Sequence, residues 1–493
     1  MALNTSRRNP RLRRFLLATA VLGAAAALLA QIGVTSAQAA DPYPSDTKPD
    51  LVPALSGYGS LWQTSGTNDL HGTVKDGPTL QWNDRVTSWI NQHATKSQQF
   101  RALQNAAYLN SDGSGYDQSN SIADGLGKNL GTIYAQGRID GDLPKVAALI
   151  NSSTGTTGGY VSTASAKAAF SYPRPFLNVD PTAPKVEGDT DACAPSKVNG
   201  SSLASIRKGK QWADAKGNLK ITRVPATVNT THTFASTDVT LDPIYGEAGL
   251  CTGGSYPSGH TTSAYEASIT LATLLPELAP QILARGSEAG NNRIVLGVHY
   301  SLDIIGGRIS GQLALASRWS DARFRKEVLN PARKELVSYL EAKCGASLAT
   351  CIAKDTSYVN NPYGGAKIPG GTAQKVTDRK SALSVYTERL SYGFAAVSST
   401  RLSPSVPQGA EALLRTTFPP LTNKQRRQVL AQTEIKSGHP LDTTISSRIG
   451  TAPGSWQRLN LAAAMSATVQ VLADGSIKVI SVGGKATVKP YKK

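Results

Sequence analysis

The chain has 493 residues, of which 40% are hydrophobic and 17% charged, with 45 glycines and 27 prolines. This composition excludes a disordered chain and is typical of a globular protein with many loops, long enough for more than one domain. The net charge of +18 favours anionic partners such as phosphate esters, nucleic acid or acidic lipid, although a solvated basic surface without a partner is an equal alternative.

Residues 1–40 have the features of an export signal. Five arginines between Arg7 and Arg14 precede an apolar run over 15–32, and Ala37-Gln38-Ala39 offers a small-residue cleavage site. An uncleaved membrane anchor is the alternative, because the run approaches spanning length. We favour a cleaved signal and therefore expect a secreted or periplasmic protein. Only five of the +18 charges lie in this segment, so the mature chain stays basic.

Residues 41–81 are rich in Gly, Ser, Pro and Asp and predict an extended N-terminal arm. From Trp82 onward, apolar residues recur at steps of three and four, which predicts helices. We expect them from Trp82 to about Ala107 and then over 122–134, 143–150, 161–170, 261–275, 289–316 and 321–340. The glycines at 306–307 predict a softened middle of one helix, and Pro331 predicts a kink in another. Residues 82–345 are thus predicted to be a mainly α domain, a helical bundle.

Two regions break the helical pattern. Residues 177–250 are Thr-rich and lack a period, which predicts a long irregular insertion. Because the insertion directly precedes Pro257, we expect it to act as a lid. Residues 346–493 predict a smaller mixed α/β extension of unknown role, with helices over 380–394 and 423–433, the second with Arg426 and Arg427 exposed. Alternating residues over 468–472 and 476–482, around Ala473-Asp474-Gly475, predict a hairpin.

The four cysteines fit two disulfides in an exported protein. Cys344 and Cys351 are close enough to close a short loop, and Cys193 and Cys251 would then pair across the insertion. Four cysteines allow three pairings, so the spacing favours this one without excluding the others. No Cys or His lies near them at metal-ligand spacing, so we expect no metal site.

No segment after residue 40 predicts a membrane span. The best candidate, 264–278, is broken by Glu266 and by Pro276-Glu277, and the run 304–315 is interrupted by Arg308 and several glycines. We therefore expect no transmembrane segment once the signal is removed.

The segment Gly-Ser-Tyr-Pro-Ser-Gly-His-Thr at 254–261 combines glycines with a helix start. Pro257 and Ser258 are typical of the first positions of a helix. We expect the N–H groups of Ser258, Gly259 and His260 to point one way, at the positive end of the helix dipole, where anions bind. A bare Pro-Ser-Gly-His, taken alone, would be an ordinary turn.

Arg293, His299 and Asp303 follow with the spacing Arg-x5-His-x3-Asp. His299 and Asp303 are four residues apart, so we expect them on one helix face, where Asp303 accepts a hydrogen bond from one ring nitrogen. The other nitrogen is then unprotonated and can attack phosphorus. Arg293 supplies a bidentate clamp for phosphate. Alone, such a His–Asp pair is often only structural.

Lys167 and Arg174 add two more cations, and Pro173 and Pro175 stiffen the backbone that presents Arg174. By themselves they would be solvated surface charges. Together the three segments hold three permanent cations, backbone amides, two imidazoles and a carboxylate. These are the parts needed to transfer a phosphoryl group without a metal.

The order and spacing of the segments resemble the phosphatidic-acid-phosphatase type 2 (PAP2) superfamily, which includes vanadium haloperoxidases. The stretch 254–261 is similar to the signature of its soluble branch, the bacterial class A non-specific acid phosphatases, as is Arg174-Pro175-Phe176. The resemblance covers about 160–310 by motif and implies a PAP2-type bundle. Asn292 departs from the family, which usually has Ser before the motif arginine.

The resemblance implies that His299 is the nucleophile of a phosphohistidine intermediate and that Asp303 orients it. His260 would protonate the leaving alcohol and then activate water. The phosphoryl oxygens would be bound by Lys167, Arg174, Ser258, Gly259 and Arg293. This implies a secreted, metal-independent acid phosphatase for small phosphate esters, without a cofactor and inhibited by vanadate. Histidines in opposite protonation states predict a bell-shaped pH profile with an acidic optimum.

Three alternatives stay open. A vanadium-dependent haloperoxidase uses the same residue types with vanadate as its cofactor. A lipid-phosphate phosphatase is disfavoured by the missing spans, and a secreted, non-catalytic polyanion-binding protein is disfavoured because every expected catalytic residue is present. We predict no nucleic acid partner, because the mature part has no dense Lys/Arg run. The sequence carries no signal for an oligomeric state.

Overall fold

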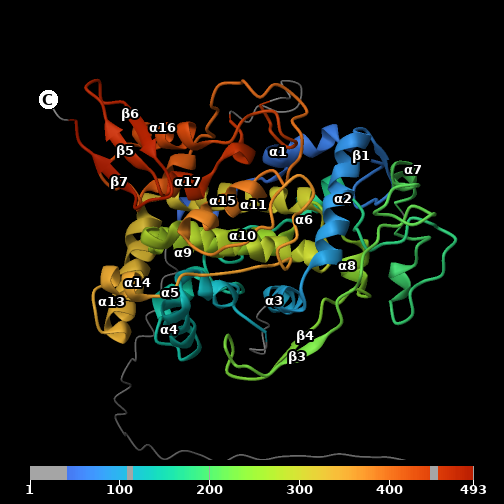
Figure 1. Ribbon diagram of the computed structural model, residues 1–493, viewed down its shortest axis with the longest axis horizontal. Coiled ribbons are helices and arrows are strands. Elements are labelled where there is room, and N and C mark those ends of the chain that lie inside the picture. The colour runs from blue at the N-terminus through green and yellow to red at the C-terminus, as the bar shows by residue number, and fades with distance from the viewer. Residues whose placement is uncertain (1–41, 108–114, 199, 445–453, 492–493) are drawn as a thin grey trace, which may run out of the picture. The chain divides into compact units, whose positions relative to one another are not determined.

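The computed structural model describes residues 42–107, 115–198, 200–444 and 454–491 (Figure 1). The expected signal, residues 1–40, lies outside the described residues. From Tyr43 onward, the described residues form one compact unit. Helices dominate it and its sheets are small, so the predicted mainly α fold is confirmed.

Three helices occupy the middle of this unit: α9 (Gly259–Leu274), α10 (Ala279–Val295) and α11 (Ser301–Ser320) (Figure 1). Helix α9 packs against both others. Glycines in α11 make this possible: a Cβ on Gly307 would lie 2.7 Å from the Cβ of Thr261, and one on Gly306 would lie 2.5 Å from the Tyr256 ring. The expectation of a softened middle at Gly306-Gly307 is wrong, because these glycines let a continuous helix approach its neighbour closely.

The single helix expected over 289–316 is also wrong. The chain leaves α10 after Val295 and re-enters a helix only at Ser301. Gly297 lies in this break with φ +70°, a left-handed conformation that glycine adopts at no steric cost. The break redirects the chain just before His299, so it helps to position the candidate site.

Shorter helices complete the bundle, and two of them differ from expectation. The helix expected over 122–134 is divided at Gly127, whose φ is +113°. The kink expected at Pro331 takes the form of a π-helical segment directly before α13. The elements are α2 (Gly77–His93), α3 (Lys96–Ala106), η3 (Asn120–Leu126), α4 (Lys128–Ile139), α5 (Pro144–Ile150), α6 (Ala164–Phe170), α12 (Ala322–Phe324), η7 (Arg325–Leu329), α13 (Asn330–Cys344), η6 (Pro276–Leu278) and α14 (Leu348–Lys354).

The N-terminal arm is not simply extended. It contains η1 (Pro44–Asp46), α1 (Val52–Leu55), η2 (Ser56–Ser60) and the antiparallel pair β1 (Trp62–Thr64) and β2 (Gly72–Val74), in which Trp62 faces Val74. Leu55, Tyr58 and Trp62 are each at most 2% exposed. The arm therefore contributes side chains to the main core, which its irregular sequence did not indicate.

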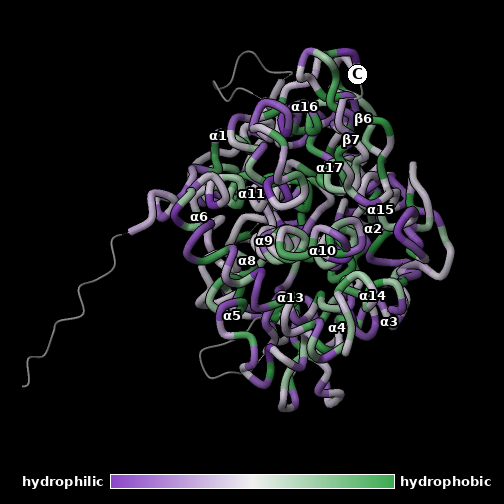
Figure 2. Tube along the Cα trace, turned by 90° about the vertical axis from the view of Figure 1, so that its left-hand side faces the viewer, coloured by the Kyte–Doolittle hydropathy of each residue, from purple (hydrophilic) through white to green (hydrophobic). Residues whose placement is uncertain are grey.

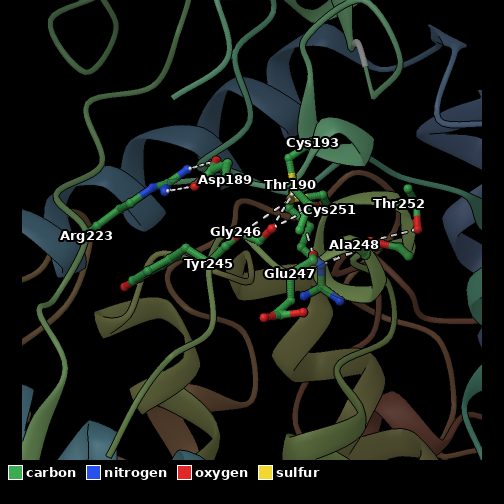
Figure 3. Close-up of a disulfide and its surroundings, with 12 residues drawn as sticks. Asp189, Thr190, Cys193, Arg223, Tyr245, Gly246, Glu247, Ala248, Cys251 and Thr252 are labelled. Atoms are coloured by element: carbon green, nitrogen blue, oxygen red, sulfur yellow. Dashed lines mark hydrogen bonds and ion pairs between the residues drawn. A yellow bond between two sulfur atoms is a disulfide. The ribbon is translucent and has the colours of Figure 1, made fainter. Parts of the chain in front are cut away.

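The insertion is largely irregular, as predicted. Its elements are η4 (Asp191–Cys193), η5 (Ser201–Leu203), α7 (Ala204–Arg207), the antiparallel pair β3 (Thr227–Asn229) and β4 (Val239–Leu241), and α8 (Ala248–Thr252). A disulfide joins Cys193 to Cys251, and beside it Arg223 donates two hydrogen bonds, of 2.7 and 2.8 Å, to Asp189 (Figure 3). The other disulfide joins Cys344 to Cys351, so the structure has the pairing that the spacing favours.

The C-terminal extension packs onto the bundle: α15 and α17 contact α10, whereas η8 and η9 contact α11. The predicted hairpin is confirmed as β5 and β6, and β7 pairs with β5 in parallel on its other side. Arg426 is only 5% exposed, so the expectation that it lies on the surface is wrong. The elements are α15 (Arg379–Arg389), η8 (Ala410–Leu414), α16 (Asn423–Thr433), η9 (Trp456–Arg458), α17 (Leu461–Ala464), β5 (Thr468–Val471), β6 (Ile477–Ser481) and β7 (Thr487–Lys489).

Hydrophilic and hydrophobic residues alternate along both the helices and the loops of the trace (Figure 2). Within the described part of the chain, no single helix has both the length and the apolar character of a membrane span. Helix α9 and the segment 276–295 meet that criterion only as a pair, bent by 116°.

Candidate active site

The three predicted segments meet where α9 and α11 begin. The Ser255 N–H donates to the Tyr172 carbonyl at 2.7 Å, which joins the second segment to the first. The Ser258 N–H donates to the Asp303 carbonyl at 3.1 Å, which joins the second segment to the third. Backbone hydrogen bonds therefore fix the segments against one another before any side chain is considered.

His299 is held at both ring nitrogens. Nδ1 lies 3.1 Å from Oδ2 of Asp303, and Nε2 lies 3.0 Å from Nη1 of Arg174. A guanidinium only donates, so Nε2 must be the acceptor and the hydrogen must be on Nδ1. His299 is 2% exposed. The ring is therefore neutral in this arrangement, with a lone pair at Nε2, which is the protonation state that the sequence predicted.

The local structure around this pair differs from expectation. His299 precedes α11 instead of lying on its face, and Tyr300 is the N-cap of that helix. Asp303, in the first turn, accepts the Tyr300 N–H at 2.8 Å with the same oxygen that faces His299. The carboxylate is thus oriented by the helix start, which favours acidic groups. His299 and Asp303 do pair as expected, but they meet at the N-terminus of a helix instead of on its face.

Arg174 and Lys167 contact the loop that leads into α9. Nζ of Lys167 donates to the carbonyls of Gly254 and Ser255 at 2.7 and 3.2 Å. Nη1 of Arg174 donates to the Val298 carbonyl at 3.0 Å, in addition to its contact with His299. Arg174 is therefore buried and Lys167 half-buried, and both donate to backbone carbonyls near the histidine.

The start of α9 has the expected cap. Oγ of Ser258 accepts the Thr261 N–H at 3.2 Å, as an N-cap side chain does. The Ser258 N–H, however, is used by the Asp303 carbonyl, so the expectation that it faces an anion together with its neighbours is wrong. Gly259 and His260 occupy the first two positions of α9, at the positive end of the helix dipole.

A cavity of about 480 Å³ opens beside His260 and Arg293. Arg293 is 3% exposed at the end of α10, and Nε2 of His260 lies 3.2 Å from the Ala106 carbonyl. Much of the remaining lining comes from the insertion, including Val239, Ile244 and Leu250. The insertion thus forms one side of the cavity at the candidate site.

Burial and the clustered cations act together on the titratable groups of the site. The pKa of His299 is well below its usual value because the ring is buried and lies near Arg174, Lys167 and Arg293. Burial and the charge of Arg293 likewise hold the pKa of His260 well below its usual value. Burial, with repulsion from Arg293, lowers the pKa of Arg174 to about 9. Around His299, the cations Lys167, Arg174 and Arg293 outnumber the single carboxylate of Asp303, which is a charge environment suited to an anion.

Lys167 and Asp303 are shifted in opposite directions by the same cause. Burial lowers the pKa of the Lys167 ammonium, and the Arg174 cation lowers it further. Burial raises the pKa of the Asp303 carboxyl, against the pull of the Tyr300 N–H and the neighbouring cations. A bound anion would favour the charged form of the lysine, so the charge of this site depends on what it binds.

A buried ion pair behind the site was not predicted. Arg207, in the insertion, donates two hydrogen bonds of 2.9 Å to Asp84 on α2, and a third of 2.9 Å to the Tyr300 hydroxyl. The pair is at most 1% exposed. It connects the insertion and the bundle to the residue that follows His299. The partners are 123 residues apart, and no motif spacing links them.

In the described part of the chain, no three His, Cys, Asp or Glu side chains are grouped so that they could hold a metal ion. The charged groups around His299 are instead mostly cations, which suit an oxyanion. Vanadate and phosphate share that chemistry.

Comparison with known proteins agrees with the motifs. Residues 147–326 match the family described as the PAP2 superfamily. An acid phosphatase of Zymomonas mobilis subsp. mobilis is 41% identical over 103 residues, which is 21% of this chain and 39% of the relative. Non-specific acid phosphatases of Providencia stuartii and Salmonella typhi are 37% and 36% identical over 79 and 83 residues, or 16% and 17% of this chain and 32% and 33% of theirs.

The resemblance to the PAP2 superfamily and its acid phosphatases is therefore confirmed over part of the chain. The chain spans only about a third to two fifths of the length of these curated relatives. The matched segment contains α6 and the whole of α9, α10 and α11, which carry or flank all three motifs.

Proposed function

We propose that this chain is a phosphomonoester hydrolase with an acidic optimum, acting through a phosphohistidine at His299 without a metal ion. The observation that carries the proposal is the protonation state of the His299 ring. Asp303 and Arg174 hold its ring with the lone pair at Nε2, and Lys167 and Arg293 lie nearby. A neutral imidazole in a cationic pocket is suited to attack a phosphate ester, whose own negative charge repels most nucleophiles.

In the first step, Nε2 of His299 attacks phosphorus and forms a P–N bond while the P–O bond to the alcohol breaks. The electron pair of that bond leaves with the alcohol oxygen, and protonated His260 donates a proton to it. Arg174, whose Nη1 lies 3.0 Å from Nε2, would move its donors to the phosphoryl oxygens. Asp303 stabilises the positive charge that develops on His299 through Nδ1–H.

In the second step, neutral His260 removes a proton from water, and the water oxygen attacks phosphorus. The P–N bond breaks, its electron pair returns to Nε2, and inorganic phosphate leaves. His260 ends protonated and His299 neutral, so the starting state is restored. Lys167, Arg174, Arg293 and the amides of Gly259 and His260 balance the phosphoryl charge in both steps, with the Ser258 hydroxyl as a further ligand.

The cavity supports small phosphate esters as substrates. Its volume of about 480 Å³ suits a small molecule, and its lining combines the apolar Val239, Ile244 and Leu250 with the acidic Asp238 and Asp242. We infer that the insertion contacts the alcohol part of the ester, which is the role expected of a lid. Export is part of the same proposal and is supported by the two disulfides, which persist in oxidising compartments.

The test is hydrolysis of p-nitrophenyl phosphate by the purified chain in EDTA, across the acidic and neutral range, beside His299→Ala. We expect turnover on the acidic side that vanadate inhibits and that the variant lacks. A matched control is His439→Ala, which removes a histidine outside the site.

Other outcomes of this assay would refute the mechanism or support one of the alternative functions. Turnover that EDTA abolishes, or that His299→Ala retains, refutes the mechanism. No turnover, together with bromination in the presence of vanadate, bromide and peroxide, identifies a haloperoxidase that uses vanadate as its cofactor. Phosphate binding without either activity supports a polyanion-binding protein.

A further inference from the structure

A second cavity, of about 370 Å³, lies where the bundle meets the C-terminal extension. The end of α11, the segment η7 and the start of α13 form one side, and η8, the chain after it and α16 form the other. Four arginines line it: Arg325, Arg333, Arg415 and Arg426. We call this cavity the arginine pocket. Arg415 and Arg426 belong to the extension, for which neither the motifs nor the family match suggests a role.

The charge of the arginine pocket is not balanced locally. Among its described lining residues there is no Asp or Glu. Arg333 pairs with Glu277 at 3.7 Å, where both side chains are more than a third exposed. Glu411 is paired with Arg427 at 3.0 Å instead. Four cations therefore face a small volume that no described carboxylate lines, because the acidic groups near it, Glu277, Glu411 and Asp321, lie outside the lining.

Burial and then mutual repulsion lower the pKa of two of these arginines. The pKa of Arg426 is lowered by burial first and by the charge of Arg415 second, and the attraction of Glu411 is smaller. The pKa of Arg325 is likewise lowered by burial and then by Arg415. Arg415 is thus the common source of repulsion, so it is the residue whose removal should relieve the cluster.

Several donors on this lining are buried without an acceptor. In the described chain, no partner is found for Nε of Arg333, Arg415 and Arg426, for Oγ1 of Thr416 or for Nε1 of Trp319. Other bonds fix Arg426 in place: it donates to the Phe418 carbonyl at 2.9 Å and to Oδ1 of Asn423 at 3.0 Å. Buried donors without acceptors cost free energy, and an oxyanion supplies several acceptors at once.

The pocket is separate from the candidate active site. Asp303 is in the first turn of α11 and Trp319 in the last, 16 residues along the same helix. At the helical rise of 1.5 Å per residue, the two sites are about 24 Å apart. An anion in the arginine pocket cannot be the one that contacts His299.

We propose that the arginine pocket is a second anion site that binds a small, multiply charged oxyanion of the phosphate class and thereby ties the extension to the bundle. Its volume is within the range of small-molecule sites, about 300–1,000 Å³. Arginine forks match the oxygens of phosphate in pairs, which favours this ligand over a halide. The proposal does not depend on the function proposed for His299.

Binding of radiolabelled inorganic phosphate by equilibrium dialysis tests the proposal, in chloride buffer of fixed ionic strength. We expect two phosphates per chain in the intact protein and one in Arg415→Gln, whose remaining site binds with unchanged affinity. Arg426→Gln should weaken the second site about tenfold, the effect of losing one charge-assisted hydrogen bond. Arg401→Gln, an exposed arginine outside the pocket, is the matched control and should still bind two.

The melting temperature with and without phosphate gives a second readout, which distinguishes loss of the site from misfolding of the variant. Without phosphate, Arg415→Gln should melt no lower than the intact protein, because it relieves repulsion. With phosphate, the intact protein should become the more stable of the two, since the ligand stabilises the folded state that binds it. Hydrolysis of p-nitrophenyl phosphate should survive in the variant.

The proposal is overturned if Arg415→Gln binds as many phosphates as the intact protein, or if phosphate raises both melting temperatures equally. Failure of the function proposed for His299 would look different: the chain would show no turnover, yet Arg415→Gln would still lose one bound phosphate.

Discussion

Replacing Asp303 with asparagine removes a negative charge beside His299 and keeps an oxygen where Oδ2 now lies. That oxygen accepts both the Tyr300 N–H, at 2.8 Å, and Nδ1–H of His299, at 3.1 Å. The amide oxygen of asparagine can accept the same two hydrogens, and Arg174 still faces Nε2 at 3.0 Å. The tautomer should therefore survive in Asp303→Asn, so the variant isolates the contribution of charge.

The expected loss of kcat follows from the interaction of the Asp303 charge with His299 during the reaction. His299 becomes positively charged when Nε2 bonds to phosphorus, and Asp303 then accepts a hydrogen bond from a charged donor. Such a bond stabilises by about 1.5–3 kcal/mol, so its loss should lower kcat about 10- to 150-fold. Asp303→Ala also leaves Nδ1–H and the Tyr300 N–H without an acceptor, so it should lose more.

The assay is the rate of p-nitrophenyl phosphate hydrolysis at saturating substrate for Asp303→Asn, Asp303→Ala and His299→Ala, with melting temperatures measured alongside. The reasoning predicts that Asp303→Asn lies between the intact protein and the other two. It is refuted if Asp303→Asn is as active as the intact protein, or if it is as inactive as His299→Ala while its melting temperature is unchanged.

Three further predictions follow from the fold and the site. Because the pKa of His260 is lowered, and the proposed reaction needs this ring protonated, kcat/KM should fall as pH rises through a value below 6.5. Gly307→Ala places a Cβ 2.7 Å from that of Thr261 and should destabilise the protein by about 1–3 kcal/mol in a denaturant titration. Asp84→Asn leaves Arg207 buried without its carboxylate and should cost about 3–5 kcal/mol in the same titration.

Each of these has a result that would contradict it. A kcat/KM still rising above neutral pH would mean that protonated His260 is not required. For Gly307→Ala, the control is Gly59→Ala, where nothing lies within 4 Å of a new Cβ; equal effects would argue against close packing at α11. For Asp84→Asn, a loss below about 1 kcal/mol would mean that the pair is solvated, as exposed pairs are.

Much of the site could be predicted because its chemistry lies in short segments. The signature at 254–261 and the Arg-x5-His-x3-Asp spacing each fall within one stretch of chain, and the structure brings them together. Helix α16 and the hairpin of β5 and β6 were also predictable, since a capping residue and a turn mark their ends. Local signals of this kind can be recognised in the sequence without knowledge of the rest of the fold.

The features that could not be predicted depend on distant contacts. The apolar residues Leu296, Val298 and Tyr300 continue the helical pattern, so the sequence did not indicate that the chain leaves the helix between α10 and α11, where His299 lies. Arg207 and Asp84 are joined only by the fold, as are the arginines of the arginine pocket. The burial of Arg426 likewise comes from the packing of its helix, which the charge of its side chain gave no reason to expect.

The most direct test of the central claim is to identify the residue that carries the phosphoryl group. Mixing His260→Ala with p-nitrophenyl phosphate should give a burst of one p-nitrophenolate per chain, because this leaving group departs without a proton whereas water attack is slow without the base. Mass spectrometry under alkaline conditions should then locate one phosphoryl group on His299. A burst with the phosphoryl group on any other residue, or turnover without a phosphorylated chain, would contradict the account.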